Sequence, residues 1–297
     1  KSRLGTRYHK HIVATTDPSK GLLRKIAQDE KLETLPIPPE LGGRFSVLSA
    51  VGLFPAALVG IDIDPLLAGA REMWRTVSDP ASAASNPSSL FAGTQHLLTR
   101  KGHPIHVLMA YADSLYLWAD WWRQLWAESL GKRLDRTGKK EVWTGPTPIK
   151  ALGPTDQHSQ VQLYAEGPAD KTVTFLTEKT SPSALAIPDT DLEELSYLSR
   201  KTFKTLNDAE QQGTEVALTK RGCPNARIEL SSVSASTLGQ LVIFFETATA
   251  LAGSLWQVNP FDQPGVEGGK NAAYALLGRR GYEAQKKELD QLLSRPA

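Results

Sequence analysis

The chain has 297 residues, of which 40% are hydrophobic and 22% are charged, and its formal net charge is +2. This length and composition predict a soluble globular protein of one large or two ordinary domains. The small net charge gives no electrostatic reason to expect nucleic acid or an anionic membrane as the main partner. The one cysteine, Cys223, excludes an internal disulfide and a cysteine-based metal cluster and fits the reducing cytoplasm. The most apolar run, Leu241–Phe245, is far shorter than the ~20 residues of a membrane span.

The beginning of the chain alternates short apolar runs with helical patterns. His11–Thr16 predicts a short buried strand, and a helix is expected from Ser19 to about Lys31. An extended piece over Leu35–Pro39 follows. Small apolar residues from Ser46 to about Val59 predict a tightly packed core helix. Strand, helix, strand, helix is the order of an α/β layer with a parallel sheet.

The rest of the chain repeats this alternation after a linker. The linker is expected at 78–89, which is rich in Ser, Ala, Pro and Asn. Further strands are expected at Pro104–Ala110, near Ile149, at Gln160–Tyr164 and at Thr172–Leu176. Helices are expected over Pro87–Leu98, Leu115–Ser129, Asp191–Gln212, Leu238–Trp256 and Asn271–Leu293. The helix over 115–129 carries its apolar residues near one face, and Gly131 is well placed to end it.

Two segments in the first half of the chain carry groups suited to chemistry. In Gly42-Gly43-Arg44, paired glycines allow the backbone to approach a ligand, and the arginine can hold an oxyanion in a fixed fork. Taken alone, a tight turn with a surface arginine explains this segment as well. Glu128 follows two apolar helical turns and lies near a helix end, where the dipole disfavours a negative charge, as suits a general base. The alternative is a solvated glutamate in the last helical turn.

Two later segments complete the set. Thr155–Tyr164 is a dense polar run in which Asp156 is close enough in sequence to orient His158, although a structural hydrogen-bonding histidine is the alternative. The prolines and glycines of Asn259–Lys270 predict a rigid loop that delivers Lys270 at the start of a helix. A capped helix start with a surface lysine is the alternative there.

Together, the order and spacing of these four segments resemble one family, the glucose-6-phosphate isomerases, and in particular its bacterial branch. The family signatures are Gly-Gly-Arg-[Phe/Tyr]-Ser, Glu-Ser-x-Gly-Lys, x-Gln-His and Asn-Pro-Phe-Asp-Gln-x-Gly-Val-Glu ending in Gly-Lys. They correspond here to Gly42–Ser46, Glu128–Lys132, Asp156–His158 and Asn259–Lys270. The resemblance implies an α/β fold with two sugar-isomerase (SIS) parallel-sheet sandwiches, the first incomplete, plus C-terminal helices. The implied boundaries are 1–80 for the end of the first SIS domain, 81–235 for the second, and 236–297 for a helical segment that completes the active site.

The resemblance also implies a reaction, the interconversion of glucose 6-phosphate and fructose 6-phosphate through a cis-enediolate, in glycolysis and gluconeogenesis. By this resemblance, Glu128 moves the proton between C2 and C1, His158 and Lys270 open the sugar ring, and Arg44 stabilises the enediolate. Gly42, Gly43 and Gln263 position the sugar or its phosphate. Neither a metal nor another cofactor is expected. The family also implies a cytoplasmic homodimer in which His158 acts in trans, in the neighbouring subunit's site.

One departure from the family pattern limits these expectations. The family holds its substrate phosphate with a Ser/Thr-rich loop in its first domain, and neither that loop nor the earlier Gly-Gly-Ser segment is found here. The chain also begins at Lys1 rather than at a methionine. These features predict a truncated or cleaved product whose missing piece is a separate N-terminal chain. An inactive fragment is one alternative. A non-catalytic sugar-phosphate-binding SIS protein is the other, although such a module needs the loop and can lack the base, the reverse of this pattern.

Overall fold

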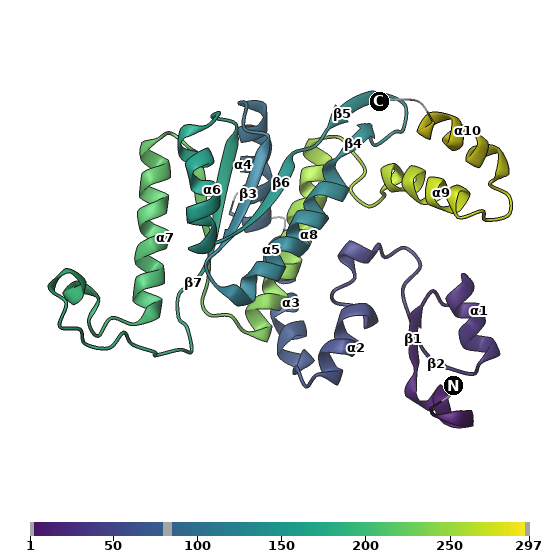
Figure 1. The fold of residues 1–297 in the computed structure, drawn as a ribbon, viewed down its shortest axis with the longest axis horizontal. Coiled ribbons are helices and arrows are strands. Elements are labelled where there is room, and N and C mark those ends of the chain that lie inside the picture. Colours follow the sequence, from purple (N-terminus) through teal and green to yellow (C-terminus); the bar gives the residue numbers. More distant parts are fainter. Residues whose placement is uncertain (1–2, 80–84, 295–297) are drawn as a thin grey trace.

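A parallel four-stranded sheet forms the centre of the computed structural model, which describes residues 3–79 and 85–294 (Figure 1). The strand order is β6-β3-β7-β8, with β6 at Thr147–Leu152, β3 at Ile105–Ala110, β7 at Lys171–Glu178 and β8 at Asn225–Leu230. All three pairings are parallel. The inner strands β3 and β7 are buried along nearly their whole length, as expected for parallel strands covered on both faces.

Helices cover both faces of this sheet. Val107 and Met109 of β3 pack in one cluster with Tyr164 of α6 (Thr155–Glu166) and Leu218 of α7 (Phe203–Lys220). The alternate residue Leu108 belongs to the cluster on the other face. That cluster is built from α4 (Pro87–Arg100), α5 (Asp113–Leu130) and α8 (Ala235–Leu255). The structure therefore confirms an α/β fold with a parallel sheet.

The N-terminal part lies apart from this sandwich (Figure 1). β1 (Val13–Thr16) pairs in parallel with β2 (Glu33–Pro36), and α1 (Leu22–Asp29) connects them, as the alternation of the sequence predicts. The following helix α2 (Ala50–Leu58) contains no buried residue, so the prediction of a tightly packed core helix is wrong. Its residues are half-buried or exposed, and Val51 and Leu58 are 39% and 69% exposed, which leaves an apolar surface in this region.

The helix α3 (Ile63–Ser78) joins the N-terminal part to the sandwich and was not predicted. It crosses α8 at very short distance. A Cβ atom built on Gly69 would lie 1.9 Å from the carbonyl oxygen of Ser236, and one built on Gly239 would lie 1.9 Å from that of Leu66. Glycine at both positions therefore allows the two backbones to meet.

Three predicted elements are wrong or divided. Gln160–Tyr164, predicted as a strand, is part of α6, whose first turn carries Asp156 where the helix dipole favours an acid. The predicted helix 191–212 is a 3-10 turn at Glu193–Leu198 followed by the start of α7. The predicted helix 271–293 is two helices, α9 (Glu267–Leu276) and α10 (Glu283–Leu293). Gly278 and Gly281 separate them with positive φ angles of 74° and 89°.

Two further features were missed or remain open. The strand β8 and the hairpin of β4 (Lys132–Leu134) and β5 (Glu141–Thr144) were not predicted. Residues 80–84 of the predicted linker 78–89 lie outside the described residues, although α3 ends at Ser78 and α4 begins at Pro87 on either side. The division into domains at residues 80 and 235 stays a prediction.

The helix α8 is long and apolar enough to cross a membrane by length and composition, and half of its most apolar window is buried inside the protein. Its residues Leu241, Phe245 and Ala248 lie in the central core cluster.

Glu246 is the acidic residue in this apolar helix, and its carboxyl group is partly buried. Its Oε1 atom is buried and has no hydrogen-bond partner among the described residues, and burial raises the pKa of Glu246 to about 8.

Replacing Glu246 by glutamine should stabilise the chain at alkaline pH. Because the pKa of Glu246 is higher in the folded chain, its contribution to stability is fully present below about pH 4.5 and is lost as pH rises towards 8. Glu246→Gln should therefore raise the free energy of unfolding by about 2–4 kcal/mol at pH 8 and change it little at pH 4.5. Urea denaturation of both proteins at the two pH values measures this difference. An equal effect of the substitution at both values would contradict the buried, unpaired carboxyl.

Candidate active site

Arg44 is the most fully bonded side chain in the region of the predicted site. It lies in the 3-10 turn Gly43–Phe45, its side chain is 1% exposed, and each of its five guanidinium N–H groups has an acceptor. Nε donates to Ser129 Oγ (2.8 Å), Nη1 to Glu128 Oε2 (3.2 Å) and Gln263 Oε1 (2.7 Å), and Nη2 to the carbonyls of Pro260 (2.6 Å) and Asp262 (2.9 Å). Arg44 therefore joins three segments that are far apart in the sequence.

Neighbouring contacts hold this turn in place. The ring of Phe45 packs against that of Phe261 at 5.4 Å between centroids, and the indole Nε1 of Trp121 donates to the Arg44 carbonyl at 3.0 Å. A Cβ atom on Gly42 would lie 3.9 Å from the Phe261 carbonyl oxygen, so Gly42 also borders the loop after α8. Burial lowers the pKa of Arg44, and the adjacent Glu128 carboxylate opposes that shift.

Glu128 occupies the last turn of α5 and is held by two hydrogen bonds. Its Oε1 accepts from Gln124 Nε2 at 3.0 Å, and its Oε2 accepts from Arg44. The Glu128 side chain is 32% exposed and lines an open hollow of about 510 Å³, together with Asp120, Trp121 and Gln124. The carboxylate is thus fixed in direction and reachable from solvent. Gln124 was missed from the sequence, although its spacing four residues before Glu128 on a predicted helix was a usable signal.

Lys132, in the same sequence motif as Glu128, is also buried. Its Nζ donates to the carbonyls of Glu128 (2.7 Å) and Asp262 (2.6 Å) and lies 3.3 Å from Asp262 Oδ1. Burial lowers the pKa of Lys132, and the contacts with Asp262 oppose that shift. By binding a carbonyl in the last turn of α5, Lys132 caps the helix on which Glu128 lies.

Lys270 and Gln263 approach the same region from the C-terminal segment. Gln263 contacts Arg44 directly. Lys270 lies on α9, is exposed, and forms an ion pair with Glu267 at 3.0 Å. The hydrogen bond that Lys270 donates to Glu267 raises the pKa of Lys270, and Glu128 contributes a smaller electrostatic effect in the same direction.

His158 lies in a different part of the structure from Glu128 and lines a different hollow. It is exposed on α6 and lines a hollow of about 800 Å³ with Tyr111, Asn207 and other residues, none of which lines the hollow of Glu128. Asp156 was expected to orient His158. Instead, its carboxylate accepts from the Leu152 N–H and the Ser159 hydroxyl, both at 2.7 Å, so its observed contacts shape the start of α6.

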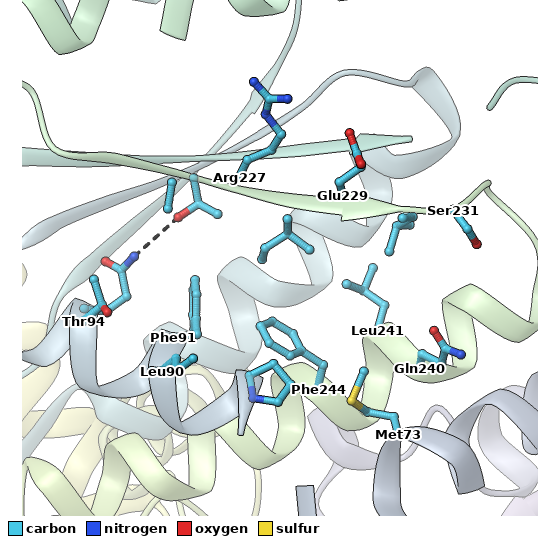
Figure 2. Close-up of a pocket in the computed structure, with 16 residues that line it drawn as sticks. Met73, Leu90, Phe91, Thr94, Arg227, Glu229, Ser231, Gln240, Leu241 and Phe244 are labelled. Atoms are coloured by element: carbon cyan, nitrogen blue, oxygen red, sulfur yellow. Dashed lines mark hydrogen bonds between the residues drawn. The ribbon is translucent and has the colours of Figure 1, made fainter. Parts of the chain in front are cut away.

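The pocket drawn in Figure 2 lies away from all of these residues. It has a volume of about 520 Å³, and its floor is formed by apolar residues of α4, α8 and β8, including Phe91, Leu241 and Phe244 (Figure 2). None of the predicted site residues lines this pocket. Across residues 3–79 and 85–294, no group of three or more His, Cys, Asp or Glu side chains is placed to hold a metal ion. The expectation that the protein needs no metal stays a prediction.

The sequence matches the family model of phosphoglucose isomerase over residues 3–191 and 198–291. This chain belongs to the phosphoglucose isomerase family. The matched ranges include every predicted site residue, from Gly42 to Lys270. The suspected family resemblance is thereby confirmed.

Relatives in this family are longer than the chain. The glucose-6-phosphate isomerase of Carboxydothermus hydrogenoformans is 46% identical over 298 residues, covering 100% of this chain and 64% of the relative. That of Rubrobacter xylanophilus is 49% identical over 280 residues, covering 93% of this chain and 62% of the relative. The chain thus spans less than two thirds of the length of these relatives.

Two solved structures show the same fold. A hypothetical protein from Thermus thermophilus superposes with a TM-score of 0.87 at 42% identity, covering 94% of this chain and 65% of that protein. A glucose-6-phosphate isomerase from Chlamydia trachomatis superposes with a TM-score of 0.76 at 23% identity, covering 96% and 56%. The second comparison shows the fold alone.

Replacing Arg44 by lysine should destabilise the chain despite the retained charge. A lysine offers three donors in place of five, so at least two of the buried acceptors would lose their partner. We expect Arg44→Lys to lower the free energy of unfolding by about 2–5 kcal/mol, as measured by urea denaturation.

The matched control is Arg123→Lys. Arg123 is 49% exposed and pairs with Asp120 on the surface of α5. This substitution should change stability by less than about 0.5 kcal/mol. Similar losses in the two variants would show that Arg44 does not hold the three segments together.

Proposed function

We propose that this chain carries the proton-transfer and ring-opening groups of a glucose-6-phosphate isomerase, which interconverts glucose 6-phosphate and fructose 6-phosphate. The observation that carries the proposal is the contact of Arg44 Nη1 with Glu128 Oε2 at 3.2 Å, at the wall of an open hollow. It places a fixed positive charge beside the only carboxylate of the Glu-Ser-x-Gly-Lys motif. A cytoplasmic location and a role in glycolysis and gluconeogenesis belong to the same proposal.

The proposed reaction uses Glu128 as a base and then as an acid. Its carboxylate takes the proton from C2 of the opened aldose, the C2 electrons form the enediolate double bond, and the negative charge passes to the C1 oxygen. The proton of the C2 hydroxyl passes to the C1 oxygen, and the C2 oxygen then forms the carbonyl. The electrons of the double bond take the proton from Glu128 at C1, which leaves the ketose and regenerates the carboxylate. Gln124 and Arg44 fix the two carboxylate oxygens, so no reorientation is needed between the steps. Arg44 supplies positive charge where the enediolate develops.

The same proposal gives Gln263, Gly42 and Gly43 the task of positioning the sugar or its phosphate. Gln263 is anchored by Arg44, and Gly42 borders the same loop. Ring opening breaks the bond between C1 and the ring oxygen: His158 takes the proton of the C1 hydroxyl, and Lys270 on α9 supplies a proton to the ring oxygen. Lys270 forms an ion pair with Glu267 at 3.0 Å.

His158 acts in trans under this proposal, in the site of a second copy of the chain. Two observations support a homodimer. The hollow of His158 shares no lining residue with that of Glu128, so one chain does not bring the two side chains together. The segment after β7 projects from the sandwich beside the same hollow (Figure 1). It exposes apolar side chains that a second copy would cover, namely Leu185, Leu192, Leu195, Tyr197 and Phe203.

A mixing experiment tests the trans assignment. Glu128→Gln and His158→Gln homodimers should both be inactive, because every site lacks one group. If the two proteins exchange subunits freely, half of the dimers are mixed and each has one intact site, so about a quarter of the sites recover. A coupled assay of fructose 6-phosphate conversion, with the N-terminal third of the Carboxydothermus relative added to every sample, measures the recovery. No recovery in a mixture that contains mixed dimers would mean that His158 acts in its own subunit or not at all.

We further propose that a segment equivalent to the N-terminal third of the longer relatives completes this site and supplies the loop that holds the substrate phosphate. The support is the exposed apolar surface of α1 and α2, which includes Leu22, Ile26, Leu58 and Val59. The sheet of β1 and β2 also has unpaired edges among the described residues, and a strand of another chain can pair there. The SIS arrangement expected for residues 1–80 is part of this proposal, because that segment would complete the first sandwich.

Turnover by this chain mixed with the N-terminal third of the Carboxydothermus relative tests the isomerase proposal. The parent mixture should convert fructose 6-phosphate, and Glu128→Gln should reduce kcat by about 10²–10⁴-fold, the usual loss for a general base. Glu166→Gln serves as the control, because Glu166 pairs with Arg221 on the surface and lines neither hollow.

Three results would overturn the assignment. Unchanged turnover in Glu128→Gln would remove the role of that residue. Binding of the sugar phosphate without turnover in the parent mixture would favour the non-catalytic sugar-phosphate-binding protein, and no binding at all would favour an inactive fragment.

A further inference from the structure

A second hollow adjoins the Arg44 cluster and is formed by residues without a role in the proposed reaction. It has a volume of about 600 Å³. Its walls are the β4–β5 hairpin and the loop after α8, and they include Arg133, Arg136, Thr137, Trp143, Asn259 and Asp262. None of these residues lines the hollow of Glu128. The hollow is therefore a separate candidate binding site.

Among the described residues that line this hollow, one cationic side chain has no ion pair. The Asp135 carboxylate accepts hydrogen bonds from the N–H groups of Thr137, Lys139 and Lys140, so it is used within the hairpin turn. Arg133 pairs with Glu141 at 3.5 Å.

Asp262 is also engaged, because Lys132 lies 3.3 Å from it and Asn259 Nδ2 donates to it at 2.9 Å. Arg136 differs from these residues. Its backbone N–H donates to the Gln257 carbonyl at 2.7 Å, which fixes its position, while its exposed guanidinium has no ion pair within the described residues. A planar guanidinium of this kind suits a phosphate or carboxylate group.

Trp143 adds an apolar surface to the same hollow. Its side chain is 72% exposed, although tryptophan is a residue that usually buries most of its area. Its backbone has a positive φ of 44°, which is uncommon for a bulky residue. Its Nε1 donates to Glu141 Oε2 at 3.2 Å, and that bond fixes the direction of the ring. The Arg133 guanidinium lies 6.0 Å from the centre of this ring, and the indole surface that stays exposed can pack against the C–H face of a sugar ring.

We propose that this hollow binds an anionic carbohydrate, meaning a sugar that carries a phosphate or a carboxylate. Arg136 pairs with the anionic group, and Trp143 packs against the ring. The site is distinct from the isomerase site and goes beyond the function proposed above.

The hollow is physically connected to the Arg44 cluster through Asp262. The Asp262 carbonyl accepts one hydrogen bond from Lys132 Nζ at 2.6 Å and another from Arg44 Nη2 at 2.9 Å. Lys132 and Asp262 both line the hollow. A ligand that displaces Asp262 therefore also changes the support of Arg44, so occupancy of this site would regulate the neighbouring one.

Binding of fructose 1,6-bisphosphate, followed by calorimetry and by the NMR signal of the Trp143 indole N–H, tests the proposal. The signal is assigned by its loss in Trp143→Phe. We expect saturable binding that shifts this signal, and a dissociation constant about 5–10-fold weaker in Arg136→Gln. Lys139→Gln removes the same charge from the same turn but does not line the hollow, so it should bind like the parent.

Two further probes separate the chemistry of the ligand. Inorganic phosphate should bind more weakly than the sugar bisphosphate, and glucose should leave the Trp143 signal unchanged. Equal losses in Arg136→Gln and Lys139→Gln would indicate general electrostatic attraction and overturn the site. Phosphate binding as tight as that of the sugar bisphosphate would overturn the carbohydrate assignment, and binding that leaves the Trp143 signal unmoved would place the ligand elsewhere.

Discussion

The guanidinium of Arg44 is the constraint on which the rest of this site depends. A buried charge is tolerated only when its hydrogen-bonding capacity is met, and here the five acceptors come from the end of α5 and from the loop after α8. One of those acceptors is the Glu128 carboxylate. The geometry of the proposed base and the packing of three distant segments therefore follow from the same set of hydrogen bonds. Lys132 supports it by binding both Glu128 and Asp262 through their carbonyls.

Much of the fold could be predicted from sequence where a local pattern and its burial agree. The strands β3 and β7 are rich in apolar and β-branched residues, and α5 ends at Leu130, directly before Gly131, as its sequence predicts. The sequence predicted the wrong element where a segment fits both the two-residue period of a strand and the continuation of a helix. Gln160–Tyr164 alternates polar and apolar residues as a strand would, but it continues a helix that begins with Asp156 in its first turn. The small apolar residues of α2 made it look like a core helix, although none of its residues is buried in the structure.

The sequence could predict which three side chains of the candidate site lie together, but not the full geometry of the site. Motif order placed Arg44, Glu128 and Gln263 in one site, and the structure brings these three side chains into hydrogen-bond contact. The distance between His158 and that cluster could not be read from the sequence, since spacing along the chain carries no information about which hollow a side chain enters. Gln124 was missed because a lone glutamine on a helix is common on protein surfaces. The hairpin that forms the second hollow was missed because its strands are short and interrupted by charged residues.

Exchange of substrate hydrogen with solvent tests the central claim, that Glu128 held by Arg44 transfers a proton between C2 and C1. Fructose 6-phosphate is incubated in D₂O with the chain and its N-terminal complement, and its C1 hydrogens are followed by NMR. The account predicts that one of the two C1 hydrogens exchanges stereospecifically, and that the exchange disappears in Glu128→Gln. Exchange of both hydrogens at equal rates, or exchange that survives the loss of Glu128, would contradict it.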